Sequence, residues 1–293
     1  MSKNQMSSPP KTVLITGCSA GGIGHALALE FKVKGYRVFA TARNPKSMKH
    51  LSEKGIETLV LDVTKEDSIR EARDKVAELT GGKLNVLINN AGATYPVPST
   101  DIEIAEAKKL FDVNLFGVMA MVKEFVHLLI ASQDGRILNI GSVAGTINLP
   151  FGSVYNATKA ALHSYGDTLR VELAPFGIQV TTVVTGGVKS NIARTDLTLP
   201  ADSLYQPIAA YYDYRLKSTS ENSNAVSAED YARRVVKEAL KSKQKIWLWT
   251  AASSTMVWFF VTFLPKRVID NIMSSMFGLS ELAKKFKAKK KAD

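Results

Sequence analysis

A serine, a tyrosine and a lysine near the middle of the chain have the types and spacing needed to move a proton to or from an oxygen atom. Tyr155 and Lys159 lie four residues apart in S-V-Y-N-A-T-K, and Ser142 precedes Tyr155 by thirteen residues. If residues 154–171 form a helix, as their pattern predicts, Tyr155 and Lys159 share one helical face. The ammonium would then lower a phenol pKa that starts near ~10, so that Tyr155 could exchange a proton with an alkoxide or alcohol. The Ser142 hydroxyl could bind the same oxygen.

A tyrosine and a lysine one turn apart are common on helix surfaces, so the interpretation depends on a second motif near the N-terminus. Residues 11–16 have the pattern of a buried parallel strand, and apolar residues recur at helical spacing from Ile23 to Phe31. The glycine-rich loop between them would let the backbone approach a pyrophosphate, which the helix N-terminus attracts. A flexible turn is the alternative, but it does not explain the flanking strand and helix. The predicted cofactor-binding residues of this loop are Gly17, Ser19, Gly22, Ile23 and Gly24.

The rest of the composition is typical of one α/β domain with extensions. A chain of 293 residues can bury a sizeable core. Alternating strand and helix patterns across residues 11–250 predict a Rossmann-type doubly wound parallel sheet. The single cysteine, Cys18, excludes an internal disulfide and favours the cytosolic side of a membrane. The four histidines lack metal-ligand spacing, so we predict no metal site.

Together these motifs resemble the short-chain dehydrogenase/reductase family over roughly residues 11–250, in the family's order. Further matches are N-N-A-G at residues 89–92, F-D-V-N-L-F-G around Asn114 and I-L-N-I-G-S ending at Ser142. The resemblance implies that Asn114 holds a water in a proton relay and that Lys159 also binds the cofactor ribose. It implies the catalytic set Asn114, Ser142, Tyr155 and Lys159. It also implies further cofactor contacts from Asp62, Val63, Asn90, Tyr155, Lys159 and Val188.

Two positions depart from the family pattern. The usual glycine loop is T-G-x3-G-x-G, whereas this chain has T-G-x4-G-x-G, with one extra residue between Gly17 and Gly22. The extra residue should change which N–H groups meet the phosphates. Thr185 replaces the proline of the family's P-G-x-V motif. That exchange should lower rigidity beside the nicotinamide but removes no catalytic group.

The end of the second predicted strand, residues 36–42, indicates which nicotinamide cofactor binds. Enzymes of this architecture that use NAD place an acidic residue there to hold the ribose hydroxyls. No acidic residue occurs between Glu30 and Glu53, whereas Arg43 follows the strand directly. An arginine can hold the 2′-phosphate of NADP with several donors. The pattern therefore predicts NADP(H), with Arg43 as the leading contact, although a merely solvated Arg43 is the alternative. The same interval also holds Arg37, Lys46 and Lys49.

Two segments around the predicted domain have a different composition. Residues 1–10 are polar and lack the apolar core of a signal peptide, so they are predicted to be a disordered leader. Residues 189–226 contain a tyrosine cluster and a polar stretch, and they follow the nicotinamide-side loop at Val188. Long segments of this kind often close over substrates, which favours a lid. A surface helix with exposed tyrosines is the alternative.

The C-terminal residues 251–293 are predicted to be an apolar helix followed by a basic tail. Residues 246–264 carry no charge. Because the family fold needs a final strand at 246–250, only about ten apolar residues remain, too few to cross a bilayer core of ~30 Å. Eight lysines and arginines then outnumber Asp270, Glu281 and Asp293. This pattern suits attachment to an anionic membrane surface, with an oligomer interface as the alternative. The net charge of +11 also raises nucleic acid as a partner, but no reader motif supports it.

A closer resemblance implies a substrate. The block L-P-F-G-S-V-Y-N-A-T-K-A-A-L-H-S-Y and the later T-G-G-V and L-P-A-D-S-L-Y are similar to the fungal NADPH-dependent 1-acyldihydroxyacetone phosphate reductases. That subfamily reduces a lipid ketone to 1-acylglycerol 3-phosphate on endoplasmic reticulum and lipid-droplet surfaces. Its relatives also serve specialised-metabolite pathways. Lys189 and Arg194 are the sequence candidates for binding the substrate phosphate, with a solvated-face role about equally favoured.

The combined expectation is a membrane-associated NADPH-dependent ketone reductase on the cytosolic face of the endoplasmic reticulum or a lipid droplet. Its partners would be a lipid-like ketone, a membrane surface and a second copy in a homo-oligomer. Within the enzyme class, the alternatives are a retinoid- or steroid-type alcohol dehydrogenase and a specialised-metabolite ketoreductase. From another class, the alternative is a non-catalytic nucleotide-sensing membrane protein, which the intact catalytic set disfavours.

Overall fold

The computed structural model describes residues 9–192, 194–220 and 224–292, so most of the predicted leader lies outside the described residues. In this part of the chain, strands β1 to β7 form one parallel sheet in the order β3-β2-β1-β4-β5-β6-β7. The predicted doubly wound parallel sheet is therefore confirmed. The strands are β1 Thr12–Ile15, β2 Arg37–Ala42, β3 Glu57–Val60, β4 Val86–Asn89, β5 Arg136–Ile140, β6 Gln179–Thr185 and β7 Trp247–Thr250.

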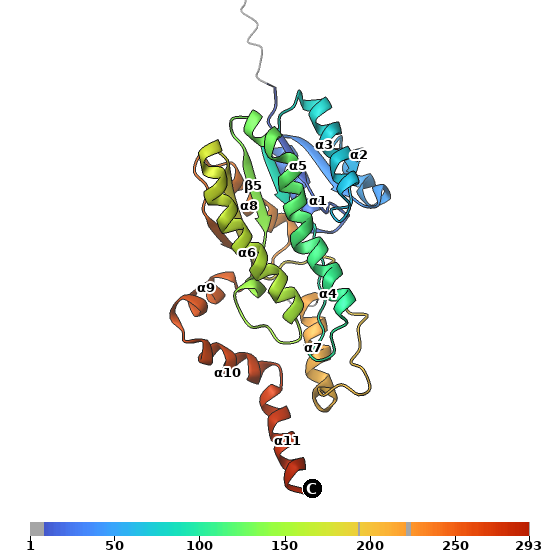
Figure 1. The fold of residues 1–293 in the computed structure, drawn as a ribbon, viewed down its shortest axis with the longest axis vertical. Helices are drawn as coiled ribbons and strands as arrows, with labels where there is room; N and C mark the ends of the chain where they lie inside the picture. The colour runs from blue at the N-terminus through green and yellow to red at the C-terminus, as the bar shows by residue number, and fades with distance from the viewer. Residues whose placement is uncertain (1–8, 193, 221–223, 293) are drawn as a thin grey trace, which may run out of the picture.

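Helices cover both faces of the sheet (Figure 1). Alternate residues of each strand point to opposite faces, so Val13 and Ile15 join a core with α1 and α8, whereas Leu14 joins a core with α3, α5 and α6. The helices are α1 Ile23–Val33, α2 Lys49–Glu53, α3 Glu66–Thr80, α4 Ile104–Phe111, α5 Gly117–Ala131, α6 Ser153–Leu173, α7 Ala209–Ser220, α8 Ala228–Ala239, α9 Ser254–Phe263, α10 Lys266–Met276 and α11 Leu279–Ala292.

The strand order reverses between β1 and β4. From β1 the chain builds outward through β2 to β3, and it then returns to β4 and builds the other way to β7. The loops that leave the carboxyl ends of β1 and β4 therefore diverge and leave a crevice between them. These two loops carry the glycine motif and the N-N-A-G motif, so the topology alone brings both motifs to one edge of the sheet.

The C-terminal helices pack on the segment predicted to be a lid (Figure 1). A cluster of Phe151, Ile208, Tyr212, Leu216 and Phe277 joins the turn before α6, helix α7 and the end of α10. Tyr212 is only 1% exposed, whereas Tyr214 is 57% exposed. The segment thus contains a helix with both buried and exposed tyrosines. Met273, Leu279 and Leu282 of the C-terminal helices also pack against this cluster.

Within the described residues, one continuous helical stretch, Ile104–Ala131, is long and apolar enough to cross a membrane by length and composition. Half of its most apolar window is buried inside the protein, and Met121, Phe125 and Leu129 of α5 belong to the core under the sheet. It is therefore a core helix. The apolar helix α9 is shorter, ten residues or about 15 Å long.

Candidate active site

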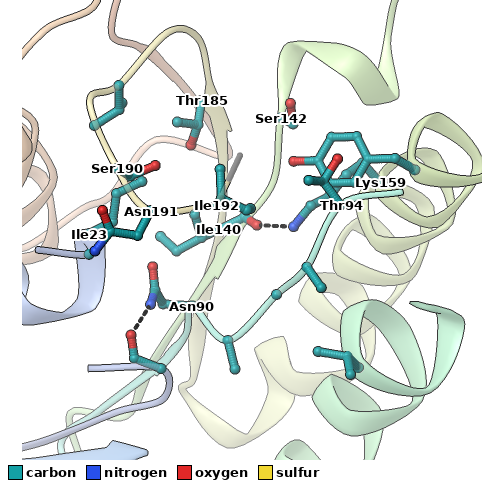
Figure 2. A pocket seen from close by; sticks show the side chains of 18 of the residues that line it. Ile23, Asn90, Thr94, Ile140, Ser142, Lys159, Thr185, Ser190, Asn191 and Ile192 are labelled. Carbon is teal, nitrogen blue, oxygen red and sulfur yellow. Dashed lines mark hydrogen bonds between the residues drawn. The ribbon is translucent and has the colours of Figure 1, made fainter. Parts of the chain in front are cut away.

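A cavity of about 610 Å³ opens at the carboxyl ends of the strands. Its walls come from the loops that follow β1, β2, β4, β5 and β6, together with residues of α6 and α7. Figure 2 shows Asn90, Ser142 and Lys159 around this space, with Ile23 and Asn191 on the glycine-loop side. The sequence-predicted residues that line it are Gly17, Ser19, Gly22, Ile23, Arg43, Asp62, Val63, Asn90, Ser142, Tyr155, Lys159 and Val188.

The glycine loop is close-packed against its neighbours. Gly17 has φ of +74°, and a Cβ there would lie 2.9 Å from the Ala91 Cα. A Cβ on Gly24 would overlap the Gly17 carbonyl, so neither position accepts a larger residue. Helix α1 begins at Ile23 with neither a side-chain cap nor an acidic residue in its first turn, all of which the structure describes. The N–H groups of that turn therefore remain available to a phosphate.

The glycine loop contacts the segment that follows β6. Gly21 has φ of +73°, and a Cβ there would lie 2.8 Å from the Asn191 amide nitrogen. That nitrogen donates to the Ala20 carbonyl at 3.0 Å. This hydrogen bond joins the glycine loop to the start of the predicted lid. Ser19 lines the cavity, and its hydroxyl shares a hydrogen bond of 3.1 Å with the Ser47 hydroxyl.

Asn90 stabilises the glycine loop through hydrogen bonds to the loop backbone. Its amide nitrogen donates to the carbonyls of Thr16 and Gly17, at 2.8 and 3.1 Å. One bond from this amide is drawn in Figure 2. In return, the Thr16 hydroxyl accepts from the backbone N–H groups of Asn90 and Ala91, both at 2.9 Å. Asn90 therefore lines the cavity and fixes the glycine loop through its amide, and its contact with the cofactor stays a prediction.

Asn114 lies in a π-helical turn, Asp112–Phe116, between α4 and α5. Such turns widen a helix by one residue and occur frequently at functional sites. The Asn114 amide is 1% exposed, accepts from the Ala93 N–H at 2.9 Å and donates to the Ala93 carbonyl and the Thr158 hydroxyl, both at 3.0 Å. A Cβ on Gly92 would lie 3.3 Å from the Asn114 Oδ1 and 3.8 Å from the Lys159 Nζ, so Asn114 and Lys159 approach the same small backbone position.

Tyr155 and Lys159 occupy one face of α6, which confirms the predicted helix. The Lys159 Nζ lies 5.8 Å from the Tyr155 ring centroid and donates to the Ile140 carbonyl at 2.9 Å (Figure 2). Ser142 follows β5 and caps a short turn by accepting from the Ala144 N–H at 3.1 Å. Helix α6 therefore carries Tyr155 and Lys159, and the end of strand β5 positions Ser142.

The charge balance around the phenol differs from the prediction. Burial raises the pKa of Tyr155, while hydrogen bonding to Ser142 and the charge of Arg215 act to lower it. Burial also lowers the pKa of Lys159 to about 8, so its ammonium carries less charge than an exposed lysine in mildly alkaline solution. Burial therefore raises the phenol pKa overall, and the lowering effect predicted for the Lys159 ammonium stays a prediction.

This arrangement can exchange a proton with an oxygen bound between Ser142 and Tyr155. A nicotinamide cofactor, when bound, supplies or accepts the hydride at the carbon of that oxygen. Ser142 orients the oxygen, and Tyr155 gives it the proton as general acid or takes it back as base. Lys159 lies beside both the phenol and the cavity, where its ammonium can bind a ribose hydroxyl and assist the phenol.

His163 was not singled out as a site residue, but it supports the catalytic serine. It lies one turn beyond Lys159 on α6, and its Nε2 accepts the backbone N–H of Ser142 at 3.3 Å. A Cβ on Gly141 would overlap the imidazole, so the loop after β5 is pressed against the ring. Burial first, and then the charge of Lys159, lower the pKa of His163 to about 4. The spacing Tyr155, Lys159, His163 is the sequence signal that would have found it.

The loop that follows β6 closes the nicotinamide end of the cavity. Thr185, which replaces the family's proline, shares a hydrogen bond of 2.7 Å with the buried hydroxyl of Tyr231. The Gly187 N–H donates to the Ala252 carbonyl at 3.0 Å, and Val188 bridges to Val226. The side-chain hydrogen bond thus supplies rigidity that the proline would otherwise give, and Val188 lies at the cavity wall as predicted.

At the other end, Arg43 lines the cavity directly after β2. Burial acts to raise the pKa of Asp62, but hydrogen bonds from Thr64 and the charge of Arg43 lower it overall. The Asp62 Oδ1 accepts both the N–H and the hydroxyl of Thr64, at 3.0 and 2.8 Å. Arg37 instead forms an ion pair with Glu57 at 2.7 Å. Arg43 is therefore the arginine of this region placed to meet a 2′-phosphate.

The two lid cations proposed from the sequence do not reach the site. Arg194 forms two hydrogen bonds with Asp196, at 2.8 and 3.0 Å, and neither Arg194 nor Lys189 is among the described residues that line the cavity. The cation that α7 does contribute is Arg215, which is 8% exposed. Phe277, from the C-terminal extension, also reaches the wall. Sequence reasoning missed both residues.

A family model described as short chain dehydrogenase matches residues 11–198. The chain belongs to the short-chain dehydrogenase family. Short-chain dehydrogenase srdE of Neurospora crassa is 44% identical over 274 residues, 93% of each chain. The NADPH-dependent 1-acyldihydroxyacetone phosphate reductase of Schizosaccharomyces pombe is 48% identical over 216 residues, 74% of this chain and 72% of the relative.

Solved structures agree on the fold of this short-chain dehydrogenase. A short-chain dehydrogenase from Streptomyces avermitilis superposes with a TM-score of 0.76 at 24% identity, over 98% of this chain and 100% of that one. A serine dehydrogenase in complex with NADP⁺ superposes with a TM-score of 0.71 at 25% identity, over 83% of this chain and 95% of that one. The first of these comparisons bears on the fold alone.

Arg43→Asp should move cofactor preference from NADPH toward NADH. The substitution puts a carboxylate where the 2′-phosphate would lie and offers a partner to the ribose hydroxyls instead. The ratio of kcat/KM for the two cofactors measures the shift. Lys46→Asp is the matched control, because it makes the same charge change nearby on a residue that is exposed and outside the described cavity wall. An unmoved ratio in Arg43→Asp would rule out Arg43 as the selecting residue.

His163 should make the fold lose stability in acid. Its pKa is lowered from 6.5 to about 4, so between pH 6.5 and about 4 the unfolded chain binds a proton that the folded protein does not bind. His163 makes its full contribution to the free energy of unfolding above pH 6.5. That contribution falls by on the order of 3 kcal/mol as the pH drops to about 4. Denaturant unfolding of wild type and His163→Gln, compared across this range, measures the difference.

The difference in unfolding free energy between wild type and His163→Gln should narrow as the pH falls, because the variant has no titrating imidazole at position 163. His127→Gln, which changes an exposed histidine on α5, should follow the wild-type curve. A gap that stays constant from neutral to acid pH would contradict the assignment.

Proposed function

We propose that this short-chain dehydrogenase is an NADPH-dependent carbonyl reductase that converts 1-acyldihydroxyacetone phosphate to 1-acylglycerol 3-phosphate, a phospholipid precursor. Membership of the family makes it an oxidoreductase. NADP(H) is supported by the basic Arg43 at the end of β2, by the NADPH-dependent relative and by the NADP⁺-bound structure. The observation that carries the proposal is a single cavity in which Tyr155 lies with a buried cation, Arg215, and apolar groups, Leu149 and Phe277.

A second candidate is reduction of a different ketone by the same groups. It is favoured by one observation: srdE of Neurospora crassa matches 93% of this chain, whereas the acyldihydroxyacetone phosphate reductase matches 74%. Both candidates share the reaction type and the cofactor.

NADPH consumption in the presence of 1-acyldihydroxyacetone phosphate tests the function. We expect the loss of NADPH to match the gain of 1-acylglycerol 3-phosphate, measured by mass spectrometry. Tyr155→Phe should lower turnover at least ~10²-fold, because it removes the proton donor and keeps the ring, while NADPH still binds. Faster reduction of an uncharged steroid or retinal than of the acyl ketone would favour the alternative substrate class, and near-normal turnover by Tyr155→Phe would refute the mechanism.

We further propose that the enzyme attaches to the cytosolic face of the endoplasmic reticulum or a lipid droplet through its C-terminal helices. Helix α9 presents exposed apolar side chains, among them Trp258 at 41%, Phe259 at 50% and Phe263 at 60% exposure. Helix α11 carries the lysines of the tail. An exposed apolar helix followed by a cationic helix is complementary to an anionic lipid surface. The alternative is that a second copy of the chain covers this face in a homo-oligomer.

Flotation with vesicles of phosphatidylcholine and phosphatidylserine tests the attachment. Replacing Trp258, Phe259 and Phe263 together by serine should abolish flotation, because each ring loses roughly 1.5–3 kcal/mol of burial in the membrane. Point changes are preferable to deleting residues 255–293, which would also remove Phe277 from the cavity wall. The matched control replaces three exposed apolar residues elsewhere by serine: Val33, Val171 and Phe176. Flotation of the α9 variant at the wild-type level would place the anchor elsewhere.

A further inference from the structure

The cavity contains a buried arginine that the catalytic chemistry does not use. Arg215 lies on α7 between Tyr212 and Leu216, and both of these neighbours belong to the apolar cluster that includes Phe151 and Phe277. The packing of α7 therefore fixes the position of the Arg215 side chain, which is 8% exposed and lines the same cavity as Ser142 and Tyr155.

The guanidinium lies beside the first turn of α6, from which the catalytic phenol projects. A Cβ placed on Gly152, the residue before α6, would lie 3.9 Å from the Arg215 Nη2. Tyr155 is three residues further along the chain. The charge of Arg215 acts to lower the pKa of the Tyr155 phenol, in agreement with this placement.

The charges along the cavity wall make this end positive. Asp62 is the one carboxylate among the described lining residues, and it lies at the Arg43 end, where it is bound to Thr64. The tyrosine end has Lys159 and Arg215. An arginine keeps its charge in almost every protein environment, and its planar guanidinium can bind a phosphate through two parallel N–H donors.

Building on the proposed function, we propose that Arg215 binds the phosphate of the ketone substrate and so sets the carbonyl against Ser142 and Tyr155. In an acyldihydroxyacetone phosphate, one methylene and one ester oxygen separate the ketone carbon from phosphorus. A phosphate held beside the first turn of α6 therefore leaves the carbonyl near the phenol. The acyl arm then extends along Leu149 and Phe277, the apolar part of the wall.

A matched pair of ketones tests this inference: 1-acyldihydroxyacetone phosphate and the same compound without phosphate. In Arg215→Met, which removes the charge and keeps a long side chain, the ratio of kcat/KM for the two ketones should fall about 10- to 100-fold. Any change in the phenol pKa acts on both ketones, so the ratio removes it. Arg194→Met is the control and should keep the wild-type ratio. An unchanged ratio in Arg215→Met, or an equal fall in Arg194→Met, overturns the inference.

A binding measurement separates this inference from the proposed substrate. With NADP⁺ saturating, so that the cofactor's own phosphate contacts are filled, glycerol 3-phosphate should raise the melting temperature of wild type and Arg194→Met but not of Arg215→Met. Arg215→Lys should keep part of the effect, because it retains the charge but loses the paired donors. This pattern supports the inference even if wild type fails to reduce the acyl ketone, a failure that rejects the substrate alone. Stabilisation that is absent in wild type, or equal in all variants, rejects the inference.

Discussion

The site depends on a lysine ammonium held in a place where burial opposes its charge. Burial lowers the pKa of Lys159 to about 8, from an ordinary value of 10.5, so the charged form costs the folded protein stability at neutral pH, and this cost diminishes as the pH rises past about 8. The Ile140 carbonyl at 2.9 Å offsets part of that cost. The small Gly92 and the π-turn at Asn114 leave the space beside the ammonium that a bound ribose can fill.

The contrast between Tyr155 and its predicted pKa shows what spacing can and cannot specify. A separation of four residues fixes that Tyr155 and Lys159 share a helix face, and it leaves open where each polar group points. In the structure the ammonium donates to a carbonyl of β5, and burial dominates the phenol. Arg215, which is 60 residues away in the sequence, acts on the phenol through space. The electrostatics of this site therefore depend on tertiary contacts between β5, α6 and α7.

The parts of the fold that could be predicted are those set by local patterns. Buried strands, the glycine loop and the helix of Tyr155 follow from residue type and periodicity, and parallel connections then bring the strand ends together. The spacing of Lys159 and His163 could likewise have indicated the buried histidine. Arg215 and Phe277 could not be predicted in the same way. Each depends on how a segment far along the chain packs on the sheet, which short-range periodicity does not encode. The lid arginine that the sequence favoured, Arg194, instead forms a local pair with Asp196.

The C-terminal extension contributes both to the cavity wall and to the exposed surface of the molecule. One side of it is built into the substrate cavity, because Phe277 packs on Phe151 and Tyr212 and also lines the wall. The other side exposes the aromatic residues of α9 and the lysines of α11. Helix α11 has both properties, because Leu282 packs on the cluster that holds Phe277 while the lysines of the helix are exposed. The position of Phe277 in the cavity wall therefore depends on the same helices that present these groups at the surface, so the shape of the cavity is coupled to the packing of the extension.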